Sequence, residues 1–535
     1  MQTEGMPTTV ISYINELKDS FEKRYQELEA RNYRLENKNQ ELEKILKQSE
    51  TEYEILSEKY KLLLFHRFSR SSEKYLESKG QPLLFNEKGS AAEVGKGEDE
   101  TTEVKSYKRK KCGRKPLDPN LPRDYENIDI PESEKICACG ARLTKIGEER
   151  SEKLHIIPQQ IFVKETIRPK YACRHCEGTA NEEAKTVKIA PVPPSIIPRS
   201  IASADLLSFI MIHKYQDHIP YYRQETQFLR LGIRISRQDM SNWQQQVYSK
   251  LEPLFRALKI ALKSGEVMQM DESPLQVMGE EDKKDTGKSY MWLARGGPPG
   301  KTVAWYEYYP NRSGASALGF LEGFKGYLQT DGYKTYDSVV KDLAGVIHVG
   351  CFAHVRRKFF EAGKAAAKSP LADEAMLFIK RLYEIENILR KQELLPEDFL
   401  EKRKAEAAPI MAAFKEWLLM QEKEVLPSSL LGGAIAYTLG QWEKLPRYLE
   451  SPYLTPDNNA AENAIRPFVL GRKNWLFNKS PDGAKSSCGM YTLIETAKQN
   501  NIEPLSYLRS LFEKAPFAVS PEDWESLLPW NIFKK

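Results

Sequence analysis

The sequence predicts a multidomain α/β protein, and three observations lead to this prediction. A seven-residue apolar repeat runs through residues 8–65 and is typical of a coiled coil. Two close cysteine pairs, within 137–139 and 173–176, indicate a small metal-binding module. After residue 264, apolar runs that end in aspartate alternate with helical patterns, which is typical of an α/β sheet domain.

Length and composition limit the number of domains and the class of protein. The chain of 535 residues, 41% of them hydrophobic, is long enough for three or four domains of ~150 residues. Its net charge of +5 is too small to indicate a polyanionic partner, so evidence for such a partner has to come from local clusters of basic residues. No apolar run approaches the ~20 residues of a membrane span, and the N-terminus lacks a secretory signal pattern. Four of the seven cysteines form tight pairs, which indicates a reducing, cytoplasmic compartment.

Residues 1–80 are predicted to form a coiled coil with a basic end. One heptad position is occupied by Ile14, Phe21, Leu28, Leu35, Leu42, Ser49, Leu56 and Leu63. The companion position includes Asn32 and Asn39, which would fix the register and favour two strands. We therefore expect a homodimer or higher oligomer. The alternative is a long amphipathic helix packed within the same chain.

Residues 81–112 are predicted to be a flexible linker, because 86–104 are rich in Gly, Glu and Lys and nearly devoid of large apolar residues. The linker leads into a basic arm that contains Arg114, Lys115 and Pro116. Such an arm contacts the phosphate backbone or enters an A·T-rich minor groove. A solvated basic loop is the alternative.

The arm and a zinc-binding module are assigned to residues 113–190. Two close thiolate pairs joined by a longer loop can close a tetrahedral zinc site, here with Cys137, Cys139, Cys173 and Cys176. The alternative is four unconnected thiols. The nearby His155 and His175 are expected to pack or to face solvent. The isolated Cys112, Cys351 and Cys488 are interpreted as small packing residues.

Residues 195–263 are predicted to be helical. A turn glycine, Gly232, precedes a serine cap and a polar helix, which is compatible with a helix-turn-helix. Its second helix would present Arg237, Gln238 and Asn242 to base edges. A helical connector packed on the next domain explains the pattern equally well.

The candidate catalytic residues begin with two aspartates that follow apolar strands. Asp271 ends the strand-like run from residue 267, and Asp331 ends the run from 326. Strand-like runs at 290–294 and 302–309, a helical 313–324, and a strand leading into a basic helix at 345–359 complete an α/β pattern. Open sheets place ligands at such strand ends. Each aspartate taken separately could instead cap a turn.

A third carboxylate, Glu462, lies on a predicted short helix. Thr455 can cap it, Pro456 suits its first position, and Pro467 disfavours its continuation. Two strand-end carboxylates and one on a later helix suit two magnesium or manganese ions, which clamp an in-line phosphoryl displacement. The alternative is a solvated helix with a Glu462–Arg466 pair.

Several motifs together make the chain resemble transposases of the IS-sixty-six insertion-sequence family. They are Met-Asp-Glu-Ser-Pro (270–274), Leu-Gln-Thr-Asp-Gly-Tyr (328–333), Gly-Cys-Phe-Ala-His-Val-Arg-Arg-Lys-Phe (350–359), residues 458–477, and Leu-Ile-Glu-Thr-Ala-Lys (493–498). The arm at 114–117 and residues 146–149 through 169–173 also match. The first cysteine pair departs from the expected pattern, because it is Cys-x-Cys rather than Cys-x-x-Cys.

The resemblance implies an RNase-H-like catalytic domain over 264–480, with a helical insertion at 365–450 and a C-terminal helical segment at 481–535. It implies that Asp271, Asp331 and Glu462 are the catalytic triad and bind magnesium or manganese, with zinc as a structural ion. The expected phosphate or substrate contacts are His354, Arg357, Asn459, Arg466, Arg472 and Lys473. Trp475 is expected either to stack on a base or to belong to the core.

The resemblance further implies a bacterial, nucleoid-associated DNA transposase that binds element ends, cleaves DNA and joins 3′ ends to target DNA. Helper proteins encoded by the same element are expected partners. Two other functions remain open: a catalytically inactive DNA-binding regulator, and an RNase-H-like nuclease that cuts without joining.

Overall fold

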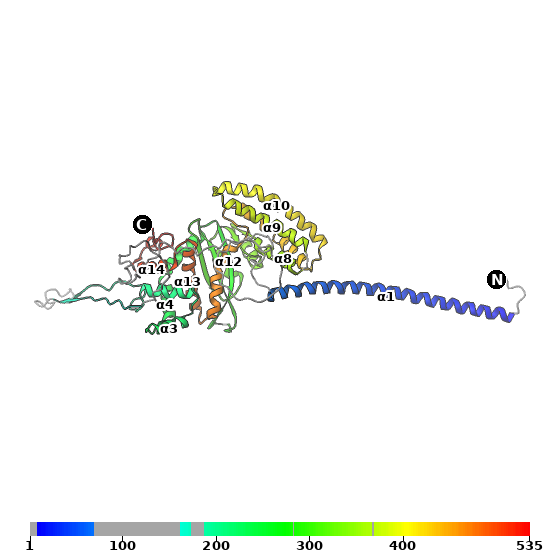
Figure 1. Cartoon of the computed structure of the whole chain (residues 1–535), viewed down its shortest axis with the longest axis horizontal. Helices are drawn as coiled ribbons and strands as arrows, with labels where there is room; N and C mark the ends of the chain where they lie inside the picture. The colour runs from blue at the N-terminus through cyan, green and yellow to red at the C-terminus, as the bar shows by residue number, and fades with distance from the viewer. Residues whose placement is uncertain (1–7, 69–160, 173–186, 282, 366–368, 535) are drawn as a thin grey trace, which may run out of the picture. The chain divides into compact units, whose positions relative to one another are not determined.

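The computed structural model describes residues 8–68, 161–172, 187–281, 283–365 and 369–534 (Figure 1). Contacts divide the chain into two compact units, one of residues 1–84 with 169–535 and one of residues 85–168. Every helix and strand of the described residues lies in the first unit. The predicted linker, the basic arm with Arg114 and Lys115, and the cysteines Cys137, Cys139, Cys173 and Cys176 lie outside the described residues.

The N-terminal segment forms one long helix, α1 (Thr8–Phe68). Its heptad side chains are exposed along its length, with 72% of Phe21, 49% of Leu35 and 66% of Leu63 accessible. Near its end, the Phe65 ring lies 6.2 Å from the Phe360 ring of α8 (Phe352–Ala365). The predicted helix is confirmed, and self-association through its apolar stripe stays a prediction.

Four helices fill the region predicted to be helical: α2 (Ala204–Tyr215), α3 (Tyr221–Arg230), α4 (Arg237–Lys250) and α5 (Glu252–Lys263). Gly232 has a φ of 83° in the turn before α4, a conformation that favours glycine. A capping box between Ser236 and Asp239 starts α4. One face of α4 buries Trp243 and Val247, while its Arg237, Gln238 and Asn242 are exposed. A buried face and an exposed polar face are compatible with both predictions for this helix, a DNA-reading helix and a packed connector.

A mixed sheet forms the centre of the first unit. Its strands are β3 (Val267–Val277), β4 (Lys288–Gly296), β5 (Val303–Tyr309), β6 (Gly326–Gln329) and β7 (Val346–Val349), in the order β5-β4-β3-β6-β7. The first three are antiparallel, whereas β6 and β7 run parallel to β3. Between the last three strands along the chain lie α6 (Gly314–Leu321) and α7 (Lys334–Lys341). The predicted succession of strands and helices is confirmed.

The edge of β5 is covered by α13 (Pro481–Gln499). The hydroxyls of Thr492 and Thr496 accept hydrogen bonds from the backbone N–H groups of Tyr306 and Ala304, at 3.0 and 3.1 Å. An uncovered edge strand would leave such donors free to pair with another chain. The C-terminal segment, which continues through α14 (Pro504–Lys514) and α15 (Pro521–Ser526), is therefore tied to the sheet.

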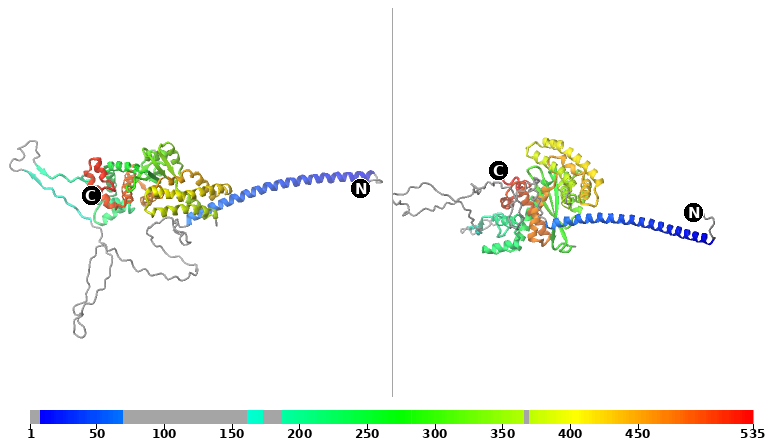
Figure 2. Two further views of the ribbon diagram at one scale, coloured as in Figure 1. Left: turned by 90° about the horizontal axis from the view of Figure 1, so that it is seen from above. Right: turned by 45° about the vertical axis from the view of Figure 1, so that its right-hand side comes forward.

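Helices also occupy the predicted insertion: α9 (Pro370–Arg390), α10 (Pro396–Glu424), α11 (Leu430–Gly440) and the 3₁₀ helix η3 (Leu445–Glu450). Phe359 of α8 packs near Phe414 and Trp417 of α10 in an aromatic cluster. In Figures 1 and 2, α8–α10 lie on one side of the sheet, and α4, α13 and α14 lie on the other.

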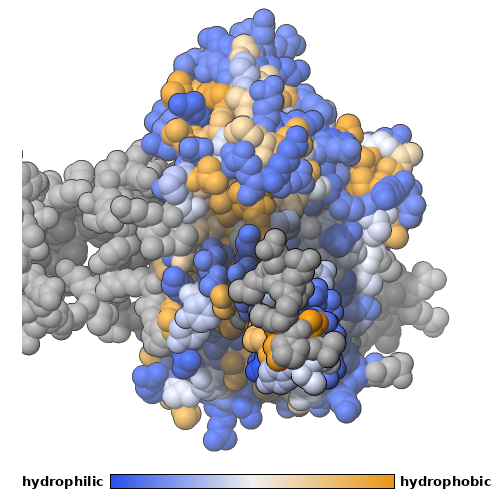
Figure 3. All heavy atoms as spheres, turned by 90° about the vertical axis from the view of Figure 1, so that its right-hand side faces the viewer, coloured by the Kyte–Doolittle hydropathy of each residue, from blue (hydrophilic) through white to orange (hydrophobic). Residues whose placement is uncertain are grey.

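No helix in the described ranges is both long enough and apolar enough to span a membrane. On the face drawn in Figure 3, hydrophilic side chains predominate and hydrophobic ones form small, separate patches.

Candidate active site

The two candidate aspartates occupy equivalent positions on neighbouring parallel strands. The last paired residues of β3 and β6 are Gln269 and Gln329, and each aspartate lies two residues further along. Asp331 lies just beyond β6, with Thr330 between it and the last strand residue, close to the predicted strand end. Asp271 lies inside β3, so the prediction that it ends its strand is wrong. The strand continues because residues beyond Asp271 pair with β4, and its last two residues pair with β8 (Phe477–Asn478).

A hydrogen-bond network beneath the aspartates fixes the loop that leads to Glu462. The Gln269 amide donates to Gln329 Oε1 at 2.8 Å, and the Gln329 amide donates to the Thr455 carbonyl at 2.7 Å. Asn458, 1% exposed, donates from Nδ2 to the Met270 carbonyl at 2.8 Å. Because Met270 precedes Asp271, this contact ties the start of the next helix to the strand that carries the first aspartate.

Glu462 lies in the first turn of α12 (Asn459–Trp475). The predicted boundaries are wrong: Asn458 rather than Thr455 is the N-cap residue, and Pro467 lies inside the helix. Thr455 instead donates its hydroxyl to the Asp457 carbonyl at 2.6 Å. The helix continues through Pro467 because Ala464, Phe468 and Gly471 are buried, and such packing offsets the lost backbone hydrogen bond.

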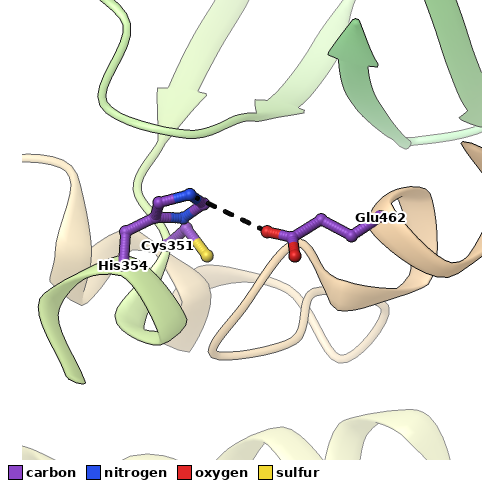
Figure 4. Close-up of side chains that lie close together, drawn as sticks. All are labelled: Cys351, His354 and Glu462. Atoms are coloured by element: carbon purple, nitrogen blue, oxygen red, sulfur yellow. Dashed lines mark ion pairs between the residues drawn. The ribbon is translucent and has the colours of Figure 1, made fainter. Parts of the chain in front are cut away.

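The Glu462 carboxylate faces α8. Its Oε1 is 3.8 Å from His354 Nε2 (Figure 4), and its Oε2 is 3.9 Å from Arg357 Nη2. Cys351, His354 and Glu462 each offer one potential ligand atom, and these three atoms lie within 4.8 Å of one another. Burial raises the pKa of the Cys351 thiol to about 12. Asp271 and Asp331 do not belong to this group of described residues.

Asp271 is affected electrostatically by the other two candidate carboxylates. Burial, followed by the negative charges of Glu272, Glu462 and Asp331, raises the pKa of Asp271 to about 7. Among the described residues, the buried polar atoms without a hydrogen-bond partner include Glu462 Oε1 and Asn458 Oδ1. A divalent cation would relieve the repulsion and satisfy an orphaned oxygen, so these residues fit the metal site that the sequence predicts.

Replacing Asp271 by asparagine is expected to stabilise the metal-free protein more at about pH 8 than at about pH 5. The folded-state pKa lies above the ordinary 3.8, so ionisation costs stability. This cost is absent below the ordinary pKa and complete above about pH 7, with an upper limit on the order of 4 kcal/mol. Urea denaturation in EDTA measures it. An equal difference between variant and wild type at both pH values would contradict the raised pKa of Asp271.

Asp331 also caps the turn that follows β6. Its Oδ1 accepts a hydrogen bond from the Tyr333 backbone N–H at 3.0 Å. The turn-capping interpretation therefore holds for one of its oxygens. Asp271 makes a comparable local contact, because its Oδ1 accepts from the Glu272 backbone N–H at 2.9 Å.

The sequence interpretation missed the role of Glu272. Its carboxylate is buried and accepts hydrogen bonds from Arg312 Nε and from the Tyr336 hydroxyl, both at 2.6 Å. Burial raises its pKa, although both partners act in the opposite direction. The Asp-Glu doublet was visible in the sequence, but its two partners lie on other elements.

The predicted substrate contacts fall into three groups. His354 and Arg357 meet Glu462, whereas the Asn459 amide donates to Asp457 Oδ2 at 2.9 Å. Asp457 is buried and also accepts from the Tyr383 hydroxyl at 2.7 Å, so Asn459 supports the loop before α12. The remaining side chains lie further along α12: Arg472 donates to the Pro274 carbonyl, and Arg466 and Lys473 are exposed.

Trp475, at the end of α12, is half-buried. Its ring lies 6.2 Å from that of Tyr215, and the Lys214 ammonium lies 5.9 Å from its centre. These contacts favour the packing interpretation of Trp475 over base stacking.

Models of known protein families match four parts of the chain. Residues 199–486 match the model of the Transposase IS66 family, which contains all three candidate carboxylates. Residues 134–177 match a zinc-finger binding domain of transposase IS66, and 492–530 match the IS66 C-terminal element. Residues 55–125 match a model described as Transposase C of IS166 homeodomain. The zinc-finger match contains the four predicted zinc cysteines.

Three relatives that align over most of this chain come from Sinorhizobium fredii. The uncharacterized protein y4jD is 32% identical over 78% of this chain and 81% of its own length. The uncharacterized proteins y4qI and y4hP are 31% and 30% identical; each alignment covers 81% of this chain, and 81% and 79% of the respective relatives. Together with the family models, these matches show that the chain belongs to the IS66 family of transposases, with a DDE transposase domain and a zinc-finger domain.

Proposed function

We propose that the protein binds the ends of an insertion element, cleaves DNA there and joins the freed 3′ ends to target DNA. The observation that supports this proposal is the interaction of three carboxylates: after burial and the charge of Glu272, the charges of Glu462 and Asp331 raise the pKa of Asp271. Asp271 and Asp331 each lie two residues beyond the last paired residues of β3 and β6, and the loop before α12, which carries Glu462, is hydrogen-bonded to both strands. The family membership supports the same reaction.

The catalytic domain, residues 264–480, is proposed to be RNase-H-like. The sheet order β5-β4-β3-β6-β7, with three antiparallel strands followed by two parallel ones, supports this assignment. The helical insertion lies between the second aspartate and the glutamate. The assignment then places the reacting phosphate at the edge of the sheet where Asp271 and Asp331 lie.

Asp271, Asp331 and Glu462 are proposed to hold magnesium or manganese, which prefer carboxylate oxygens. When bound, these ions would supply Lewis-acid stabilisation of the attacking and leaving oxygens in phosphoryl transfer. His354 and Arg357 would contact the phosphate beside Glu462, and the exposed Arg466, together with Arg472 and Lys473, would contact the DNA backbone along α12. Asn459 would keep the Glu462 loop in place through Asp457.

Recognition of the element ends is proposed to involve three other regions. These are the basic arm, a zinc site formed by Cys137, Cys139, Cys173 and Cys176, and the exposed face of α4 with Arg237, Gln238 and Asn242. The exposed apolar stripe of α1 would pair two chains, so that one complex holds two element ends. Proteins encoded by the same element would assist.

A strand-transfer assay on labelled element ends tests the proposal. With magnesium, the purified chain is expected to nick the ends and join them to a second duplex, whereas calcium is expected to support binding alone. Nicking without joining would indicate an RNase-H-like nuclease. DNA binding without any magnesium-dependent nicking would indicate a regulator that has lost catalysis.

A further inference from the structure

Three potential ligands of a softer cation lie beside the carboxylates. Cys351 directly precedes α8, and His354 follows three residues later, so both side chains lie on one face of the helix start. Glu462 faces them from α12, and the three ligand atoms lie within 4.8 Å (Figure 4). We propose that Cys351, His354 and Glu462 form a Zn²⁺ site that shares Glu462 with the catalytic triad.

Hydrogen bonds join the two backbone segments that position these three residues, the start of α8 and the loop before α12. Cys351 is 4% exposed, and its Sγ accepts a hydrogen bond from the Asn458 backbone N–H at 3.3 Å. The neighbouring Phe352 N–H donates to the Pro456 carbonyl at 2.9 Å. The start of α8 and the loop before α12 are thus joined directly at the site. Held in this way, the ligands would lose little conformational freedom when an ion binds.

Two of the ligand atoms are placed as an ion would require. His354 Nε2 and Glu462 Oε1 are 3.8 Å apart, which is too far for a hydrogen bond. Two atoms that each bind zinc at ~2.0–2.2 Å lie at most about 4.2 Å apart, so this separation suits a shared ion. Glu462 Oε1 is also buried without a hydrogen-bond partner among the described residues. Leaving such an oxygen unsatisfied is costly, and a cation would remove that cost.

The donor set selects the ion. A thiolate, an imidazole and a carboxylate are typical zinc ligands, whereas magnesium prefers oxygen ligands alone. Arg357 lies 3.9 Å from the other oxygen of Glu462. At His354, the negative charges of Glu462 and Asp331 act against the positive charges of Arg357 and Lys358. The chemistry of the three ligands, rather than the local charge, therefore favours zinc.

Zinc at this site would oppose catalysis, an effect that rests on the proposed magnesium-dependent function. A zinc ion on Cys351 and His354 would keep the Glu462 carboxylate on the α8 side, away from Asp271 and Asp331. Zinc should then inhibit magnesium-dependent cleavage in competition with magnesium. Cys351 itself has no part in the proposed phosphoryl transfer.

The test compares Cys351→Ser with Cys488→Ser in the full chain. Serine at 351 can still accept the hydrogen bond from Asn458, and Cys488 is a second buried free cysteine, located on α13. After dialysis against zinc, metal analysis is expected to find one zinc ion fewer per chain in Cys351→Ser than in wild type and Cys488→Ser. With Co²⁺ in place of zinc, the thiolate absorption band is expected to be weaker in Cys351→Ser alone.

Cleavage assays at fixed magnesium give the functional comparison. Cys351→Ser is expected to cleave without zinc as wild type does. Its half-inhibiting zinc concentration is expected to rise by more than the roughly 10–100-fold that loss of an outer-shell partner costs. If Cys351→Ser does not fold, His354→Gln, which removes the imidazole, is expected to lose the same zinc equivalent.

Equal zinc content, or equal inhibition by zinc, in Cys351→Ser and Cys488→Ser would overturn the site. Failure of the proposed function is distinguishable, because wild type would then not cleave with magnesium at all. The zinc content and the cobalt spectrum would still decide the metal site in that case.

Discussion

Replacing Glu462 by glutamine is expected to abolish DNA cleavage and strand transfer while DNA binding persists. The same result is expected for Asp271→Asn and Asp331→Asn. Each change removes one anionic ligand from the proposed metal site and keeps the size of the side chain. Metal ions contribute several kcal/mol of transition-state stabilisation, and each 1.36 kcal/mol is a factor of ten in rate. The expected loss is therefore at least about a thousandfold.

Asn463→Gln is the matched control for Glu462→Gln. Asn463 is the next residue of α12 and is exposed, so its replacement changes the helix surface without touching the three carboxylates. Gel shifts in calcium measure DNA binding, and single-turnover reactions in magnesium measure cleavage and joining. Strand transfer by purified Glu462→Gln near the wild-type rate would refute the assignment of the triad.

The sheet could be predicted from the sequence because its signals are local. Apolar runs bounded by turn residues identified every strand from β3 to β7, and the heptad repeat identified α1. The position of Asp271 within its strand could not be predicted in this way. Its strand extends to Val277 because of pairing with β4 and with β8, and β8 lies far away in the sequence.

The candidate site could likewise be predicted only in part from local sequence signals. The three carboxylates could be proposed from their residue types and from the family resemblance, but local rules placed the start and end of α12 incorrectly. Burial of Ala464 and Phe468 outweighs the preference of Pro467 to end a helix. Cys351 appeared to be an isolated packing residue, because nothing in its neighbourhood along the chain indicates that Glu462 faces it. Contacts between segments that are distant in the sequence determine both the length of α12 and the neighbours of Cys351.

The second large effect is expected at Arg403 of α10, in the helical insertion. Its side chain is 0% exposed, and it donates hydrogen bonds to three backbone carbonyls, those of Tyr448, Ser451 and Leu454, at 2.8–3.0 Å. It also forms an ion pair with the buried Glu386 of α9 at 2.9 Å. Removing one partner of a buried ion pair typically costs about 3–5 kcal/mol. Glu386 would keep its second partner, Arg390 at 2.6 Å, but three buried carbonyls would lose their charged donor. Arg403→Ala is therefore expected to lower the free energy of unfolding by about that amount.

Lys402→Ala is the control, since Lys402 is the exposed neighbour of Arg403 on α10 and surface changes usually stay within about 0.5 kcal/mol. Arg403→Lys is expected to recover only part of the loss, because an ammonium cannot reproduce the planar fork of the guanidinium. Urea denaturation measures all three variants, and a loss below about 1 kcal/mol in Arg403→Ala would contradict this role.

The insertion should also affect catalysis through Arg403. The carbonyls that Arg403 holds lie in η3 and between η3 and Thr455, in the segment that leads to Asn458 and then to Glu462. Loosening that segment would misplace Glu462 relative to Asp271 and Asp331, which stay fixed on the sheet. Under conditions in which Arg403→Ala remains folded, its cleavage rate is therefore expected to fall more than its DNA affinity. Equal losses in both would mean that the insertion stabilises the fold without positioning the catalytic glutamate.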